Sequence, residues 1–249
     1  MSGHNRWTKI KRQKEAMGAS KGNLFTKVIK EITVAARMGG GDPDGNARLR
    51  SALLAARAAN MPNDTIQRAI KKGTGELEGV NYEEITYEGR GPGGVAIVVE
   101  CLTDNRNRTF GEIRNIFTKG GGSVGEPNSA TYLFDRRGVI TVTGTTEDAL
   151  MEAALEAGAL DIEAGDDEGS FTVLTEPTDV HRVAGALEKA SFKISEAKSK
   201  YLPQNAIALD AEKAPKMLKL IENFEDNDDV QNVYANFEID DEVMAQLEG

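Results

Sequence analysis

The sequence predicts an α+β protein of three domains, in which a basic three-helix bundle precedes two ferredoxin-like α/β domains, one inserted into the other. The chain of 249 residues is too long for one small core. Apolar residues recur at helical spacing up to about residue 79, and beyond it strand and helix spacings alternate. Residues 1–79 contain 15 Lys and Arg against 7 Asp and Glu (net +8), whereas residues 80–249 contain 15 against 33 (net −18). This asymmetry indicates a first third that is attracted to polyanions, although the whole chain is acidic.

Residues 1–22 are expected to form a mobile basic arm. Glu15 is the only acidic residue in it, and its few apolar residues bury too little surface to offset the entropy of ordering. Trp7 lies between cations and could stack on a base or pack the arm against the bundle, and both alternatives stay open. The candidate nucleic-acid contacts of the arm are Arg6, Trp7, Lys9, Lys11, Arg12, Lys14 and Lys21.

Residues 23–79 are expected to form the helical bundle. In its first helix, from Asn23 to the glycines at 39–41, the apolar residues share one face. Lys27 and Lys30 fall on the other face at 100° per residue, so both are candidate phosphate contacts.

The second and third helices of the bundle are joined by a short link. Leucines point inward in the second helix, over residues 46–60. In the third, Asp64 and Gln67 resemble a capping box, and Gly73 marks the end. The cations of the third helix either complement the helix dipole or bind phosphates. The candidate contacts of these two helices are Arg48, Arg50, Arg68, Lys71 and Lys72.

Residues 136–203 carry a complete β-α-β-β-α-β pattern, which is typical of a ferredoxin-like domain. Its strands are expected at 139–142, 161–164, 170–174 and 192–197, and its helices at 146–157 and 180–191.

The segments before and after this domain, 80–135 and 204–249, together predict a second ferredoxin-like domain that is discontinuous in sequence. The first supplies strand 94–102, helix 109–119 and strand 130–134, and the second supplies strand 206–209, helix 212–224 and strand 230–237. The helix at 109–119 is expected to turn Phe110, Ile113, Ile116 and Phe117 inward.

Residues typical of enzymes are scarce. No HExxH, GxSxG, CxxC or P-loop pattern occurs, and the glycine-rich stretch 89–94 leads into a strand, so it is expected to be a turn. Cys101 lies in an apolar run and is expected to fill a core, although a catalytic pairing with His181 stays open. We therefore predict no catalytic residue, no metal site and no cofactor.

The polar stretch 103–109 joins a strand to a helix. Asp104 or Asn107 could cap that helix, which would leave Arg106 and Arg108 solvated. Alternatively, the two arginines bind a phosphate or an acidic surface, and the sequence favours neither interpretation.

Several motifs of the chain resemble the YebC family. They are Gly3-His4-Asn5-Arg6-Trp7, Phe25-Thr26-Lys27, Ala35-Ala36-Arg37, Gly39-Gly40-Gly41-Asp42-Pro43-Asp44, Asn60-Met61-Pro62, Arg68-Ala69-Ile70-Lys71-Lys72-Gly73, Tyr87-Glu88-Gly89, Gly91-Pro92-Gly93-Gly94-Val95 and Thr103-Asp104-Asn105-Arg106-Asn107-Arg108-Thr109. The resemblance implies three domains with a basic helical first domain, and a DNA-binding transcriptional regulator. The family also includes a mitochondrial translational activator of cytochrome c oxidase and members associated with ribosomes.

We therefore expect a non-enzymatic nucleic-acid-binding regulator of gene expression, monomeric or weakly oligomeric, with possible protein partners at its acidic domains. No apolar run approaches the roughly 20 residues of a membrane span, and one cysteine suits a reducing compartment, so a cytoplasmic location is expected. Gln67 and Arg68 are a thin set for reading bases, which favours sequence-indifferent binding. A translation factor bound to ribosomal RNA is the alternative, and an enzyme using an interdomain cleft is a distant one.

Overall fold

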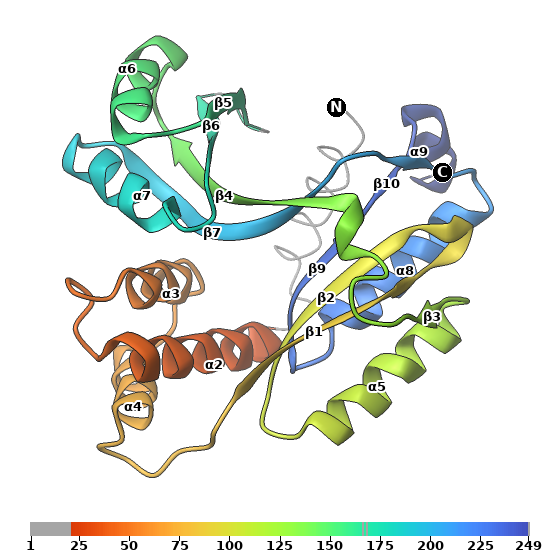
Figure 1. Ribbon diagram of the computed structural model, residues 1–249, viewed down its shortest axis with the longest axis horizontal. Helices are drawn as coiled ribbons and strands as arrows, with labels where there is room; N and C mark the ends of the chain where they lie inside the picture. Colours follow the sequence, from red (N-terminus) through yellow and green to blue (C-terminus); the bar gives the residue numbers. More distant parts are fainter. Residues whose placement is uncertain (1–20, 166, 168, 249) are drawn as a thin grey trace. The chain divides into compact units, whose positions relative to one another are not determined.

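The computed structural model of the chain describes residues 21–165, 167 and 169–248, and its contacts divide the chain into two compact units (Figure 1). Unit 1 combines the chain up to Lys30 with Val80–Asp135 and Pro203–Gly249. Unit 2 combines Glu31–Gly79 with Arg136–Leu202. Both units mix helices with antiparallel sheets, which confirms the α+β class. The finer division into domains stays a prediction.

Three helices open the described chain: α2 (Lys21–Gly39), α3 (Ala47–Ala58) and α4 (Asn63–Thr74). Gly40 follows α2 with φ +85°, a left-handed conformation that only glycine adopts at little cost. Asn46 caps α3, because its side chain accepts a hydrogen bond from the Leu49 backbone N–H at 3.0 Å. The same buried side chain donates to the carbonyl of Ala35 at 2.7 Å, which ties the start of α3 to α2.

Helix α4 differs from its prediction at both ends. It begins at Asn63 after Pro62 without a side-chain cap, so Asp64 lies inside the first turn and the predicted capping box is wrong. Gly73 lies within the helix, where an added Cβ would come within 2.4 Å of the Thr33 carbonyl oxygen. Glycine is therefore needed there for close packing on α2, and Gly75, with φ +83°, ends the helix instead.

Unit 2 also contains the predicted β-α-β-β-α-β domain. Its elements are β4 (Phe134–Thr143), α6 (Glu147–Ala157), β5 (Asp161–Ala164), β6 (Ser170–Thr175), α7 (Val180–Lys189) and β7 (Lys193–Pro203). The sheet order is β5-β6-β4-β7, with β4 antiparallel to β6. This is the ferredoxin-like order, so the predicted element order is confirmed. Ile140, Val173, Leu150 and Leu187 belong to one buried core between the sheet and the two helices.

Unit 1 is built on a second four-stranded sheet, of order β3-β1-β2-β9 (Figure 1). Its strands are β1 (Glu83–Arg90), β2 (Ala96–Thr103), β3 (Ser123–Val124) and β9 (Val230–Ala235), and its helices are α5 (Arg106–Lys119) and α8 (Lys213–Glu225). Ile97 and Val99 of β2 share a core with Phe117 of α5 and Phe224 of α8. The two phenylalanine rings pack edge to face, with their centroids 4.7 Å apart.

Two strands of this sheet, β1 and β3, come from segments that were not predicted as strands. The predicted strand 130–134 is largely a 3-10 turn, η2 (Thr131–Leu133). The predicted strand 206–209 is only β8 (Ile207–Ala208), which pairs with β10 (Phe237–Glu238) outside the sheet. Instead, β1 lies between β3 and β2. A ferredoxin-like strand order is thus retained, although its third strand precedes the first in sequence.

Two further elements complete the fold. A short 3-10 turn, η1 (Pro92–Gly94), joins β1 to β2, and α9 (Asp241–Glu248) ends the described chain.

On α5, Ile113 and Phe117 are buried as predicted, but 44% of Phe110 is exposed, so its predicted inward position is wrong. Over the described part of the chain, no helix combines the length and apolar character that crossing a membrane requires.

Candidate nucleic-acid interface

The exposed face of α4 carries three cations. Arg68, Lys71 and Lys72 are spaced i, i+3 and i+4, which places them side by side on one face of the helix. The opposite face is buried through Ile66, Ala69, Ile70 and Gly73, and this burial holds the cations outward.

Among the residues that the structure describes, none makes a hydrogen bond or ion pair with the side chain of Arg68, Lys71 or Lys72. Gln67 is exposed beside Arg68. The face can therefore offer three charged donors to an anion without first breaking an internal contact.

Two other predicted cations of the bundle are held by protein groups. Arg48 forms a two-pronged ion pair with Glu31 at 2.6 and 3.1 Å. Arg50 donates to the Pro43 carbonyl at 2.6 Å and lies 4.0 Å from the carboxylate of Glu188. Both side chains orient the fold locally, so each would have to share its charge with any phosphate.

The structure corrects the predicted position of two lysines on α2. Lys30 is buried, and its ammonium donates to Asp229 Oδ1 at 2.5 Å and to the carbonyl of Asp228 at 2.8 Å. Lys27 is half-buried and donates to the carbonyl of Glu225, at the C-terminal end of α8. Lys30 therefore faces the interior of unit 1, because Asp229 and carbonyl groups of the same unit take up its charge.

Asp229 is the centre of a buried polar network in unit 1. It also accepts hydrogen bonds from Arg108 at 2.8 Å and from the Thr109 hydroxyl at 2.7 Å. Burial alone would raise the pKa of Asp229, but the hydrogen bonds from Arg108, Lys30 and Thr109 outweigh it and lower the pKa to about 2.

The two arginines of the loop before α5 have different roles. Arg108 donates to Asp104 at 2.8 Å as well as to Asp229, so its guanidinium is a structural link. Arg106 is largely exposed, and the nearest carboxylate, that of Glu83, is 3.9 Å away. Neither Asp104 nor Asn107 caps the helix, because Asn105 accepts the hydrogen bond from the Arg108 backbone N–H. Arg108 would therefore have to share its charge between these carboxylates and a phosphate, whereas Arg106 is open to one, and their role as a phosphate-binding pair stays a prediction.

The side chains of the remaining predicted nucleic-acid contacts are not described by the structure. Arg6, Trp7, Lys9, Lys11, Arg12 and Lys14 fall outside the described residues, and of Lys21 only its position at the start of α2 is described.

Arg57 is an exposed cation of the bundle that was not among the candidates. Arg57 lies in the last turn of α3, and it has no partner within the described ranges. A cation at a helix C-terminus is already explained by its interaction with the helix dipole, so the sequence contained no separate signal for a binding role of Arg57.

Cys101, one of the two residues for which a catalytic role stayed open, has an unreactive thiol. Cys101 is buried in the core of unit 1, and burial, more than the neighbouring Asp229, raises the pKa of its thiol to about 12. Such a thiol carries almost no thiolate at neutral pH.

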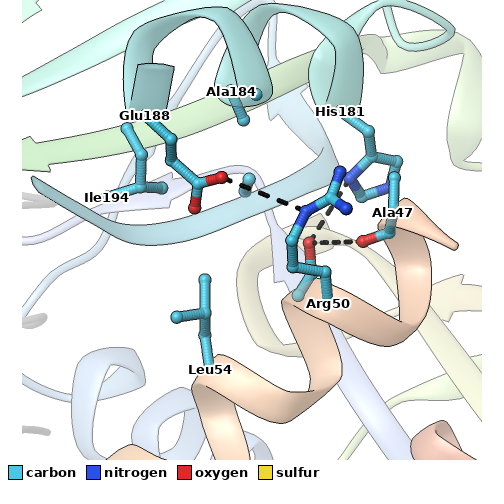
Figure 2. A pocket seen from close by; sticks show the side chains of 10 residues that line it. Ala47, Arg50, Leu54, His181, Ala184, Glu188 and Ile194 are labelled. Carbon is cyan, nitrogen blue, oxygen red and sulfur yellow. Dashed lines mark hydrogen bonds and ion pairs between the residues drawn. The ribbon is translucent and has the colours of Figure 1, made fainter. Parts of the chain in front are cut away.

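His181 lies in unit 2, where its Nδ1 is 3.3 Å from the Ser51 hydroxyl (Figure 2). The hollow beside them is lined by residues of α3, α7 and β7 and has a volume of about 10 Å³, at the lower limit for one water molecule. No group of three or more His, Cys, Asp or Glu side chains in the described segments is arranged to hold a metal ion.

Comparison with known proteins identifies relatives over nearly the whole chain. The model of the TACO1/YebC protein N-terminal domain matches residues 5–76, and that of the TACO1/YebC second and third domain matches residues 82–237. A protein of Myxococcus xanthus named probable transcriptional regulatory protein is 58% identical over 99% of both chains. A protein of Geobacter sulfurreducens with the same description is 56% identical, over 99% of this chain and 100% of its own.

A solved structure supports the same relationship. The crystal structure of a conserved hypothetical protein from Aquifex aeolicus matches with a TM-score of 0.80 and 46% sequence identity, over 90% of this chain and 92% of the other. Both parts of the chain thus match one family in sequence, and the fold agrees. The chain belongs to the TACO1/YebC family.

Proposed function

We propose that this chain is a non-enzymatic, DNA-binding transcriptional regulator that acts in the cytoplasm and binds phosphates through α4 and the basic segment 1–22. Its relatives at 58% and 56% identity are named probable transcriptional regulatory proteins. The basic sequence of the first 79 residues supports a polyanionic ligand, and the buried, inert thiol of Cys101 supports a role without thiol chemistry.

The observation that carries the proposal is the contrast between α4 and several other basic side chains that were predicted to bind phosphates. Arg68, Lys71 and Lys72 share an exposed face without a protein partner in the described part of the chain. By contrast, Lys30, Arg48 and Arg108 are bound to carboxylates of the protein itself. Freely exposed cations on a rigid helix are the groups that can replace counterions along a nucleic-acid backbone.

Such contacts would position the protein on DNA and carry little sequence information. Exposed Gln67 and Arg68 are the side chains of α4 suited to reading base edges. We therefore propose modest sequence preference and strongly salt-dependent binding.

The test compares two charge reversals in the full chain. Lys71→Glu with Lys72→Glu should weaken binding to a short labelled DNA duplex, measured by fluorescence anisotropy, and reduce the slope of log affinity against log salt by about 2. The matched control is Lys189→Glu with Lys193→Glu, which reverses two exposed lysines of unit 2 that also lack partners among the described residues. Equal loss in both variants would show a general charge effect and contradict a site on α4.

A second measurement separates DNA from the ribosome. Lysate is sedimented through a sucrose gradient, and the distribution of the wild-type chain is compared with that of the α4 variant. A regulator of transcription should stay at the top of the gradient and bind a promoter duplex at physiological salt. Co-sedimentation with ribosomal particles that depends on Lys71 and Lys72, without such duplex binding, would overturn the assignment to DNA.

A further inference from the structure

Helix α5 presents a stripe of side chains that the proposed function does not use. Arg106, Phe110 and Arg114 are spaced i, i+4 and i+8, and all three are exposed. This spacing places them on neighbouring turns of one side of the helix, over about 12 Å between the first and last Cα atoms. An exposed aromatic ring therefore lies between two cations.

The ring of Phe110 is held in place. It packs against the ring of Tyr87 on β1 with centroids 6.0 Å apart, and 44% of its surface stays exposed. The neighbouring Gly111 is exposed as well, and no heavy atom lies within 4 Å of the position that a Cβ would take. The helix surface directly beside Phe110 is thus open at Gly111.

The charges of α5 are sorted between its two sides. Arg108 and Glu112 face the 227–229 loop, where Arg108 binds Asp229 and Glu112 accepts a hydrogen bond from Asn227 at 2.8 Å. On the Phe110 side, Arg114 has no partner among the described residues.

Arg106 is only weakly engaged. Among the described residues its side chain pairs only with Glu83, at 3.9 Å, and both of these side chains are more than 60% exposed. A solvated pair of this kind is easily given up to a phosphate.

We propose that this stripe binds single-stranded nucleic acid, with an unpaired base stacked on Phe110 and flanking phosphates on Arg106 and Arg114. Exposed aromatic rings bind bases through their π-faces, and arginines bind the backbone on either side. A base inside a duplex cannot reach the ring, so the site selects unpaired strands. It is separate from α4 in sequence and in its ligand, and it goes beyond the proposed binding of duplex DNA.

The test uses the full chain and a labelled single-stranded oligouridine. Phe110→Ala should weaken binding about five- to a hundredfold, as expected for the loss of one stacked base. Phe110→Leu keeps an apolar side chain without the aromatic ring, and it should lose most of the same affinity. Arg114→Glu should also weaken binding, whereas Lys119→Glu, an exposed cation on the other side of the same helix, should have little effect.

Three controls make the result decisive. Thermal melts should show that every variant folds. If Phe110→Ala does not fold, Phe110→Leu provides the test of the aromatic ring. Duplex binding should be unchanged by the α5 variants, and the Lys71→Glu, Lys72→Glu variant should keep the Phe110 dependence on oligouridine. Unchanged oligouridine binding by both Phe110 variants would overturn the proposal, and so would equal loss with Lys119→Glu. Failure of duplex binding alone would overturn only the function proposed for α4.

Discussion

The ammonium of Lys30 on α2 donates a hydrogen bond of 2.5 Å to the carboxylate of Asp229, and both side chains are almost fully buried in unit 1. The two residues are 199 positions apart in the sequence. Arg108 and Thr109 bind the second oxygen of the same carboxylate, so one acidic group joins α2 to the start of α5. A lysine that belongs to the basic first third thus stabilises the fold and is not available at the surface.

Removing the charge of Asp229 should destabilise the protein. In Asp229→Asn, Lys30 stays buried without a counter-charge, and the free energy of unfolding should fall by about 3–5 kcal/mol. Urea denaturation measures the change, and Asp228→Asn is the matched control because the Asp228 side chain is exposed. A loss no larger than that of the control would show that the buried pair contributes little.

The same carboxylate should make the protein sensitive to acid. The pKa of Asp229 is about 2 in the folded chain, against an ordinary value of 3.8. A group with a lowered folded pKa contributes stability above its unfolded pKa and loses it as the pH falls through the folded value. Roughly 2 kcal/mol of stability should therefore be lost between about pH 4 and pH 2. Urea titrations over this range should show a smaller loss for Asp229→Asn, and an identical loss would contradict the assignment.

His181 should add a second pH dependence closer to neutrality. Burial lowers the pKa of His181 below 6.5, and the nearby charges of Arg50 and Arg48 lower it further. As the pH falls, His181 is therefore protonated in the unfolded chain before it is protonated in the folded chain. The contribution of neutral His181 to the free energy of unfolding is fully present above pH 6.5, and it is lost as the pH drops toward the folded pKa. His181→Asn should remove this part of the pH profile of the unfolding free energy. A profile identical to that of the wild type would assign the effect to other groups.

The basic segment before α2 should supply much of the electrostatic binding to DNA. Reversing Lys9, Lys11, Arg12 and Lys14 to Glu should abolish most duplex binding, because each lost phosphate contact lowers the salt slope by about 0.9. The melting temperature should be unchanged if the segment lies outside the folded core. Anisotropy titrations at several salt concentrations test this, and retained, salt-independent binding would contradict it.

The segment 136–202 should fold when expressed alone. Its core contains Ile140, Leu150, Val173 and Leu187, and every buried residue of that core comes from this segment. A cooperative melt together with dispersed amide resonances is the expected result. The chain in which a short Gly/Ser linker replaces this segment is the complementary variant, and it should keep a folded unit 1. Aggregation of both pieces would contradict an insertion.

Local patterns in the sequence were enough to predict much of this fold. The three helices of the first third, the β-α-β-β-α-β segment and the family resemblance depend on periodicity, glycine positions and short motifs. These signals come from residues close in sequence, and helix and hairpin geometry turns them directly into structure. The absence of catalytic motifs was likewise read from the sequence.

Strand β1 and the position of Phe110 were decided by tertiary structure. The β1 sequence contains three glutamates, which hid its strand character, and its place in the sheet depends on pairing with β2 and β3. Glu88 is buried there because its carboxylate accepts hydrogen bonds from the backbone N–H groups of Asn128, Ala130 and Thr131. The exposed side of Phe110 likewise depends on how α5 packs on the sheet.

The sequence by itself determined that the first third is basic, but only the tertiary structure decided which of its cations remain exposed. Lys30 binds Asp229 and Arg48 binds Glu31, whereas Arg68, Lys71 and Lys72 have no partner in the described chain. The sequence shows the sign of each charge and its position along the chain. The availability of each cation depends on whether folding brings a carboxylate within hydrogen-bonding distance, and for Lys30 that carboxylate comes from 199 residues away.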